Sequence, residues 1–190
     1  MANELVYGDR IYLLNGYDGW QGGYLDTIHH SAAGGAKYGV ETAETPTRGA
    51  GTGTWEILSP SGKAVGATVS SGDLIYLFNL YGGDGGYLDA NGPADSAQKS
   101  DGGMYDVTTS QTVDRYPGTG RWRIFARTSS PGDQAIRIDD VVLLWNTYAE
   151  NGGFLETNGL STVGDKLNVC TNAYFNRSAN VADWRVHRAS

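Results

Sequence analysis

The feature that most constrains this sequence is a threefold internal repeat. Three similar segments begin at Gly8, Gly72 and Asp139, and they read GDRIYLLNGYDGWQGGYLDT, GDLIYLFNLYGGDGGYLDANG and DDVVLLWNTYAENGGFLETNG. The later parts of the units also match, because each unit ends in a tryptophan segment, GTWEI, GRWRI or ADWRV. One such unit cannot bury its apolar residues alone, so the three units are expected to share one core.

Each unit contains four short runs typical of β-strands. The runs IYLLN, IYLFN and VVLLWN are rich in β-branched and aromatic residues, and the later runs alternate in polarity. Glycine pairs and Asn/Asp clusters separate them. The sequence therefore predicts an all-β chain of twelve short strands, a β-trefoil in which a six-stranded barrel is capped by three hairpins. We expect one domain, 1–190, with repeats of roughly 5–70, 71–137 and 138–190; a three-bladed propeller would be unusually small.

Several repeated apolar positions are predicted to form the core. Leu25, Leu88 and Leu155 each lie between an aromatic residue and an acid that are expected to face outward, which places the leucines on the inner face of a strand. The tryptophans that begin the last strand of each unit have an apolar residue two places further on, so we expect them in the core as well. These are Trp55, Trp122 and Trp184.

Composition and charge exclude several classes of partner. The chain has 14 Lys and Arg against 21 Asp and Glu, a net charge of −7, and no basic cluster of the kind that binds nucleic acid. No apolar run approaches the ~20 residues of a membrane helix. The first ten residues, MANELVYGDR, do not resemble a signal peptide, and Cys170 is the single cysteine. We therefore expect a cytoplasmic protein, or one exported without a signal peptide.

The sequence offers little for catalysis. His29 and His30 are adjacent, so on an extended strand they point in opposite directions, and Cys170 is predicted to be buried. A glycosidase using Asp18 and Asp26 would need a deep cleft. No calcium-loop pattern is present, so neither a metal nor a cofactor is expected. We expect no enzymatic activity.

The most distinctive polar pattern is an ordered motif that occurs in every unit. It consists of an asparagine, a tyrosine, a first acid, a pair of glycines, an aromatic residue and a second acid. Aromatic faces can stack on sugar rings, and carboxylates and amides accept or donate hydrogen bonds to hydroxyls. Alternatively, the second acid of each unit caps loop amides or pairs with Arg48, Arg115 or Arg177. The predicted ligand-binding residues are Asn15, Tyr17, Asp18, Gly23, Tyr24, Asp26, Asn79, Tyr81, Asp84, Gly86, Tyr87, Asp89, Asn146, Tyr148, Glu150, Gly153, Phe154 and Glu156.

These motifs resemble the β-trefoil lectin superfamily, especially ricin-type B domains. The segments GGYLDT, GGYLDA and GGFLET are similar to the strand that supplies the sugar-binding aspartate of that family, and GTW, GRW and ADW stand where its Q-x-W motif belongs. Thr42, Thr109 and Thr171 occupy the place of its stacking aromatic residue, so the family's galactose pocket is not carried over. The rhythm G-D-x-I-x-L…G-G-Y-L also resembles fascin-like and MIR-type trefoils, which bind actin or other proteins.

The pattern and the resemblance together predict a lectin. Up to three related sugar sites would give multivalent recognition of glycans, with no nucleic acid and no membrane insertion. The alternative is a protein-binding trefoil, either a cytoskeletal module or a protease inhibitor. An inhibitor would use one exposed loop, such as Thr42–Thr54 or Asn91–Gly103.

Overall fold

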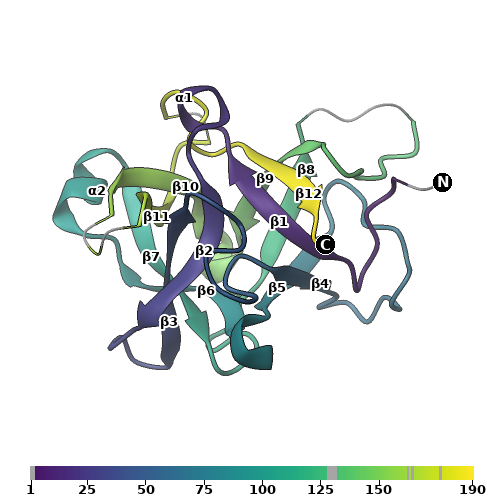
Figure 1. Cartoon of the computed structure of the whole chain (residues 1–190), viewed down its shortest axis with the longest axis horizontal. Coiled ribbons are helices and arrows are strands. Elements are labelled where there is room, and N and C mark those ends of the chain that lie inside the picture. The colour runs from purple at the N-terminus through teal and green to yellow at the C-terminus, as the bar shows by residue number, and fades with distance from the viewer. Residues whose placement is uncertain (1–2, 128–131, 162, 164, 176) are drawn as a thin grey trace.

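The computed structural model describes residues 3–127, 132–161, 163, 165–175 and 177–190 (Figure 1). It is an all-β fold in which the strands are joined by loops and by short helical segments. The helical segments are α1 (Tyr17–Trp20), η1 (Tyr81–Gly83), α2 (Ser96–Ser100) and η2 (Tyr148–Glu150). The strands are β1 (Arg10–Asn15), β2 (Tyr24–His30), β3 (Ala36–Ala43), β4 (Trp55–Leu58), β5 (Leu74–Asn79), β6 (Gly86–Pro93), β7 (Gly103–Ser110), β8 (Trp122–Ala126), β9 (Val141–Asn146), β10 (Gly153–Leu160), β11 (Leu167–Asn172) and β12 (Trp184–Arg188).

All strand pairs are antiparallel, and they join the strands into one continuous sheet. The pairings close a barrel of ten strands in the order β1, β2, β3, β11, β7, β6, β5, β8, β9 and β12, and β12 returns to β1. The two outer strands each bridge two strands of this ring: β4 pairs with β1 and β5, and β10 pairs with β9 and β11. Closure leaves few unpaired strand edges.

These strand pairings show that the predicted β-trefoil arrangement is wrong. We expected a barrel of six strands with three separate hairpins as caps. Instead, the second strands of the hairpins pair with one another across the repeats, with Asn168 opposite Glu41 and Cys170 opposite Asp106. The closed ring of ten strands therefore runs through the hairpins, because hydrogen bonds between repeats make them part of the barrel wall.

The core lies inside the barrel and contains the apolar residues predicted from the repeats. Trp55, Trp122 and Trp184 have no exposed surface, and neither do Leu25, Leu88 and Leu155. Each indole Nε1 donates a hydrogen bond of 2.9 Å to the carbonyl oxygen of the core leucine in its own repeat. The prediction of these residues as core is confirmed, and the hydrogen bond explains how an indole N–H is tolerated there.

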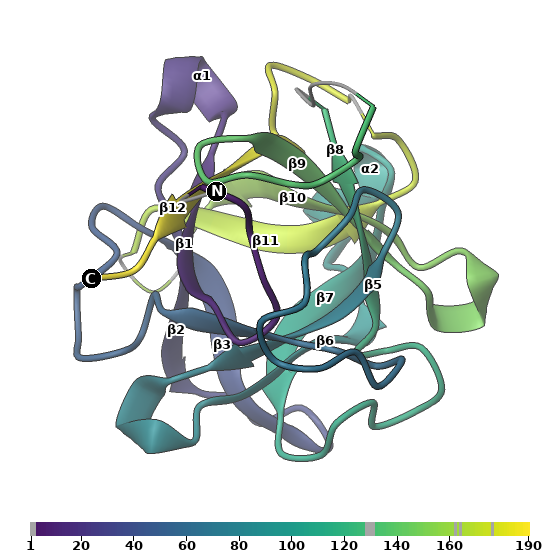
Figure 2. The same cartoon turned by 90° about the vertical axis from the view of Figure 1, so that its right-hand side faces the viewer.

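Three short helical turns project from the barrel in three directions. Figure 2 shows α1 in purple, η1 in teal and η2 in light green at well-separated places on the rim. Each turn contains a residue with positive φ directly after its tyrosine, namely Asp18 (48°), Gly82 (60°) or Ala149 (51°). The turns therefore reverse the chain within a few residues and present the tyrosines at the rim.

Truncation of a core tryptophan should destabilise the protein strongly. We expect Trp122→Ala to lower the free energy of unfolding by ~3–5 kcal/mol, because it empties a fully buried site and leaves the Leu88 carbonyl without its donor. Urea denaturation followed by circular dichroism measures the change. Val65→Ala is the control, since Val65 is 80% exposed. A Trp122→Ala variant as stable as the control would contradict the core assignment.

Candidate functional site

The asparagine at the end of the first strand of each repeat is buried and joins two repeats. Asn15, Asn79 and Asn146 have no exposed surface. Their Oδ1 atoms accept hydrogen bonds of 3.0–3.1 Å from the backbone N–H two residues later. Their Nδ2 atoms donate bonds of 2.8 Å to a carbonyl of the preceding repeat, for Asn15 that of Val181. These asparagines position the tyrosine turns instead of facing a ligand.

The glycine pairs that follow the turns are fixed by two different constraints. A Cβ on the first glycine would lie only 2.2–2.3 Å from the Oδ1 of the buried asparagine, as at Gly85. The second glycine has a φ near +90° and faces a backbone carbonyl, as Gly86 faces Ser110. The predicted site residues Gly23, Gly86 and Gly153 are all buried, so they serve the turn.

The second acid of each repeat is buried and paired with an arginine. Asp26, Asp89 and Glu156 have no exposed surface. The closest ion-pair distances are 2.7 Å for Asp26–Arg48, 3.1 Å for Asp89–Arg115 and 3.1 Å for Glu156–Arg177. Burial raises the pKa of all three carboxyls above its usual value, while their arginines act in the opposite direction. Pairing with an arginine is one of the two alternatives to sugar binding that the sequence left open for these acids. A ligand can reach their oxygens only by displacing an arginine.

The remaining predicted residues lie nearer the surface, in two separate groups. The turn residues Tyr17 and Tyr81 are each 40% exposed. Their acidic neighbours are exposed as well, and Asp84 forms an ion pair of 2.7 Å with Lys37. The aromatic residues after the glycine pairs are half-buried against other rings and lie apart from the turns. These are Tyr24, Tyr87 and Phe154.

The third repeat differs from the other two at the position against which the turn tyrosine packs. Tyr38 and Tyr105 make edge-to-face contacts with Tyr81 and Tyr148, with ring centroids 5.3 and 5.4 Å apart. The equivalent residue of β11 is Leu167, which lies opposite Leu160. Because leucine is smaller than tyrosine, the space beside Tyr17 is not filled by a ring.

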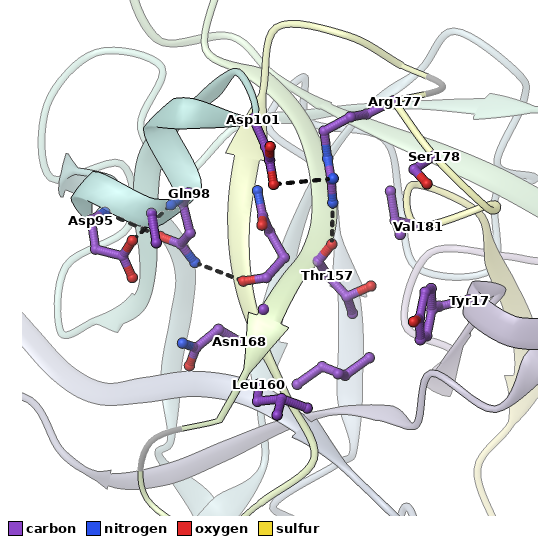
Figure 3. Close-up of a pocket in the computed structure, with 14 residues that line it drawn as sticks. Tyr17, Asp95, Gln98, Asp101, Thr157, Leu160, Asn168, Arg177, Ser178 and Val181 are labelled. Carbon is purple, nitrogen blue, oxygen red and sulfur yellow. Dashed lines mark hydrogen bonds and ion pairs between the residues drawn. The ribbon is translucent and has the colours of Figure 1, made fainter.

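A cavity of about 540 Å³ opens at this place (Figure 3). Tyr17 and Leu160 lie on its apolar side, and Leu160 is 78% exposed. Asp101 and Arg177 lie together at one end of the cavity, and Asn168 adds a polar group near Leu160 (Figure 3). The other lining residues are Asp95, Ala97, Gln98, Thr157, Asn158, Gly159, Leu167, Ser178 and Val181.

The opposite wall of the cavity comes from α2, which belongs to the second repeat. Asp95 caps this helix, since its Oδ1 accepts a hydrogen bond of 2.8 Å from the backbone N–H of Gln98, and the Gln98 side chain accepts one from the Asp95 N–H. Gln98 Nε2 then donates a bond of 3.4 Å to the carbonyl of Asn158 on β10. The cavity is therefore built by all three repeats, with Tyr17 from the first, α2 from the second and β10 and β11 from the third.

Of the residues that line this cavity, the sequence predicted only Tyr17 as a sugar-binding residue. The loop Asn91–Gly103, which contains α2, was expected only as an alternative inhibitor loop. A search for what the repeats share favours residues such as Asp26, which turn out to be structural. The available signal was a difference between the repeats: the alignment of Tyr38, Tyr105 and Leu167 breaks in the third unit. The helix α2 gives no such signal, because it lies in a linker between repeated segments.

A second hollow of about 520 Å³ lies between β3, β7 and β11 and has acidic walls. Glu41 and Asp106 line it together with His29. Burial raises the pKa of Asp106 to about 6, and it also raises the pKa of Glu41. Among the described residues, no group of three or more His, Cys, Asp or Glu side chains is arranged to hold a metal ion.

Cys170 has the environment of a structural residue. Its side chain is fully buried and its Sγ lies 3.8 Å from Oε1 of Glu156. Burial raises the pKa of the thiol, which favours its protonated, unreactive form. Within the described ranges, no helix is long and apolar enough to cross a membrane.

Comparisons with known proteins identify related structures but no family. No protein-family model and no curated protein matches the chain. An SDF2-like protein from Arabidopsis thaliana superposes with a TM-score of 0.71 at 16% identity, covering 96% of this chain and 94% of that protein. A Caenorhabditis elegans protein with unknown function gives 0.72 at 14% identity, with coverage of 97% and 96%.

A third neighbour is the Saccharomyces cerevisiae protein O-mannosyltransferase Pmt1–Pmt2 complex bound to its sugar donor. It gives a TM-score of 0.67 at 19% identity, and it covers 99% of this chain but 26% of that one. At such identities the similarity shows the fold alone. None of these three neighbours is described as a ricin-type B domain, and the predicted relationship to that family is wrong. The GGYLD segments that suggested it serve the turns and the buried ion pairs.

Loss of an arginine that pairs with a buried acid should cost more than loss of an exposed arginine. Arg115→Ala leaves Asp89 buried without its cation, so we expect the free energy of unfolding to fall by ~3 kcal/mol. Arg10→Ala is the control, because Arg10 is 63% exposed and its pair with Glu56 is worth about 0–1 kcal/mol. Chemical denaturation of both variants measures the difference. Equal, small losses would show that Arg115 contributes no more than a surface charge.

From the raised pKa of Asp106 we predict how the stability of the protein depends on pH. In the folded protein this carboxyl holds its proton up to about pH 6, whereas in the unfolded chain it loses it near its usual value of 3.8. Wild-type stability should therefore decrease, relative to Asp106→Asn, as the pH rises from about 4 to 7. The difference reaches at most ~3 kcal/mol, since one pKa unit corresponds to ~1.4 kcal/mol. Thermal melts of both proteins at pH 4 and 7.5 test it, and a pH-independent difference would contradict it.

Proposed function

We propose that this protein is a non-enzymatic carbohydrate-binding module whose site is the cavity of the third repeat. The observation that carries the proposal is the open cavity of about 540 Å³ with an exposed aromatic ring on one side and charged and amide groups on the other. This volume lies within the range of ~300–1,000 Å³ typical of small-molecule sites. The sugar-donor complex among the structural neighbours agrees with a sugar-related role.

The chemistry of the lining suits a sugar ring. The C–H face of a sugar is apolar and can stack on Tyr17, with Leu160 extending the apolar surface. Hydroxyl groups both donate and accept hydrogen bonds, which matches the guanidinium of Arg177, the carboxylate of Asp101 and the amide of Asn168. Arg177 is held by Glu156, so it presents its charge in a fixed position.

We propose one site rather than the three equivalent sites expected from the repeats. The turn tyrosines Tyr81 and Tyr148 make edge-to-face contacts with Tyr38 of the first repeat and Tyr105 of the second. A ligand that stacks on either of these turn tyrosines would have to compete with this internal ring contact. Binding should therefore have a stoichiometry of one ligand per chain and show little avidity unless the chain self-associates.

A protein ligand is the second candidate, and one observation favours it. Four apolar side chains of the third repeat are exposed: Leu160 (78%), Tyr174 (65%), Phe175 (52%) and Val163 (47%). Exposed apolar side chains of this kind are also typical of protein interfaces. A glycan array separates the two functions, since a sugar module binds immobilised glycans and is inhibited by free sugar. A chain that binds no glycan on the array would contradict the proposal.

Two tyrosines at equivalent repeat positions provide a matched test. Tyr17→Ala should weaken glycan binding about tenfold, because it removes the stacking surface of the cavity. Tyr81→Ala is the control, since Tyr81 has the same 40% exposure but lies over the first repeat. Isothermal titration with the best glycan from the array measures both affinities. Equal losses in the two variants would favour equivalent sites and contradict a single site.

Filling the cavity should abolish binding without unfolding the protein. Leu167→Tyr introduces the residue that the other repeats carry at Tyr38 and Tyr105, so the fold accepts it at this strand position. We expect an unchanged melting temperature and loss of glycan binding by more than about tenfold. A folded Leu167→Tyr variant with wild-type affinity would show that the glycan binds elsewhere.

A further inference from the structure

A further hollow lies beside the cavity of the third repeat. It has a volume of about 590 Å³ and is lined by Lys99, Ser100, Asp101, Gly102, Tyr174 and Arg177. Two of these residues, Asp101 and Arg177, also line the cavity described above. The two spaces are therefore neighbours, and the same pair of side chains forms the wall between them.

This dividing pair is fixed by contacts with the barrel. Arg177 Nη1 lies 3.5 Å from Oδ2 of Asp101, and the dashed line in Figure 3 marks this pair. Arg177 forms an ion pair of 3.1 Å with the buried Glu156, and it donates a hydrogen bond of 3.3 Å to the carbonyl of Thr157. The carbonyl of Asp101 accepts a bond of 2.9 Å from the buried Asn172. The Arg177 side chain and the Asp101 backbone are thus anchored, and the guanidinium and carboxylate can offer polar groups to a ligand on either side.

An exposed tyrosine stands at each end of the combined surface. Tyr17 lines the cavity and Tyr174, which is 65% exposed, lines the second hollow. Tyr174 is held in place at its backbone, whose N–H donates a bond of 2.9 Å to Asn172. Its ring lies against Gly102, where a Cβ would come within 2.9 Å of Cδ2. The chain therefore presents Tyr174 in a defined place despite its exposure.

The second tyrosine is also specific to the third repeat. Arg48, Arg115 and Arg177 are equivalent, and the residue three places before each of them is Thr45, Thr112 and Tyr174 respectively. The repeat that lacks the filling tyrosine at Leu167 is thus the one that gains an exposed tyrosine outside the cavity.

We infer that the ligand is a linear neutral oligosaccharide of at least two sugar units that spans both hollows. This inference rests on the proposed function. One unit stacks on Tyr17 in the cavity and the next lies against Tyr174, while Asp101 and Arg177 between them bind hydroxyl groups. Charge favours a neutral glycan, because the acids Asp95 and Asp101 balance Lys99 and Arg177 along the combined surface.

The test compares affinity with chain length. The probes are three series of sugars with one, two or three units, each titrated calorimetrically into the wild-type protein. The series are glucose, maltose and maltotriose; glucose, cellobiose and cellotriose; and N-acetylglucosamine with its di- and trisaccharide. For the series that binds, we expect the affinity to rise about tenfold from one unit to two or three. Tyr174→Ala should remove this rise and leave the affinity for the monosaccharide unchanged.

Tyr116→Ala is the control, because Tyr116 is 59% exposed but lies in the second repeat. An affinity independent of length, with Tyr174→Ala equal to wild type, would overturn the two-unit site while the sugar-binding function stands. Failure of every probe, together with a blank glycan array, would overturn the proposed function itself. A loss of monosaccharide affinity in a folded Tyr174→Ala variant would also contradict the division into two subsites.

Discussion

The buried asparagine at the end of the first strand of each repeat is the contact on which the other features depend. Asn15 donates to a carbonyl of the third repeat, Asn79 to one of the first and Asn146 to one of the second. The three bonds form a cycle that ties every repeat to its neighbour. An unpaired amide at these positions would be costly, since each side chain is fully buried. The cycle also explains why Tyr17, which belongs to the first repeat, lies over the third.

The repeats made the all-β class, the strand positions and the tryptophan core predictable. Polarity that alternates with a period of two, and residues that recur at equal spacing in each repeat, both indicate which side chains are buried. The arrangement of the strands was not predictable in the same way. Local patterns show which residues form strands, but pairs such as Asn168–Glu41 depend on how the three hairpins meet. The pattern could not show whether Asp26 faces solvent or Arg48, since both arrangements keep a carboxylate at that position.

The candidate site illustrates how function can arise where symmetry is lost. The shared residues of the repeats maintain the turns, the ion pairs and the core, so they are the wrong place to look for a ligand. Leu167 differs from Tyr38 and Tyr105 by the loss of a ring, and the resulting space is bordered by α2, which has no repeated counterpart among the described helical segments. A cavity built by three repeats but present at one position follows from these two local differences, and we propose it as the binding site.

The most direct measurement is a two-dimensional NMR titration of the ¹⁵N-labelled protein with the glycan that binds best on an array. If the cavity is the site, the backbone signals that shift should cluster at Tyr17, Gln98, Leu160, Leu167 and Arg177, while those around Tyr81 and Tyr148 stay unchanged. Shifts of equal size at all three tyrosine turns, or shifts confined to residues outside the third repeat, would contradict the account.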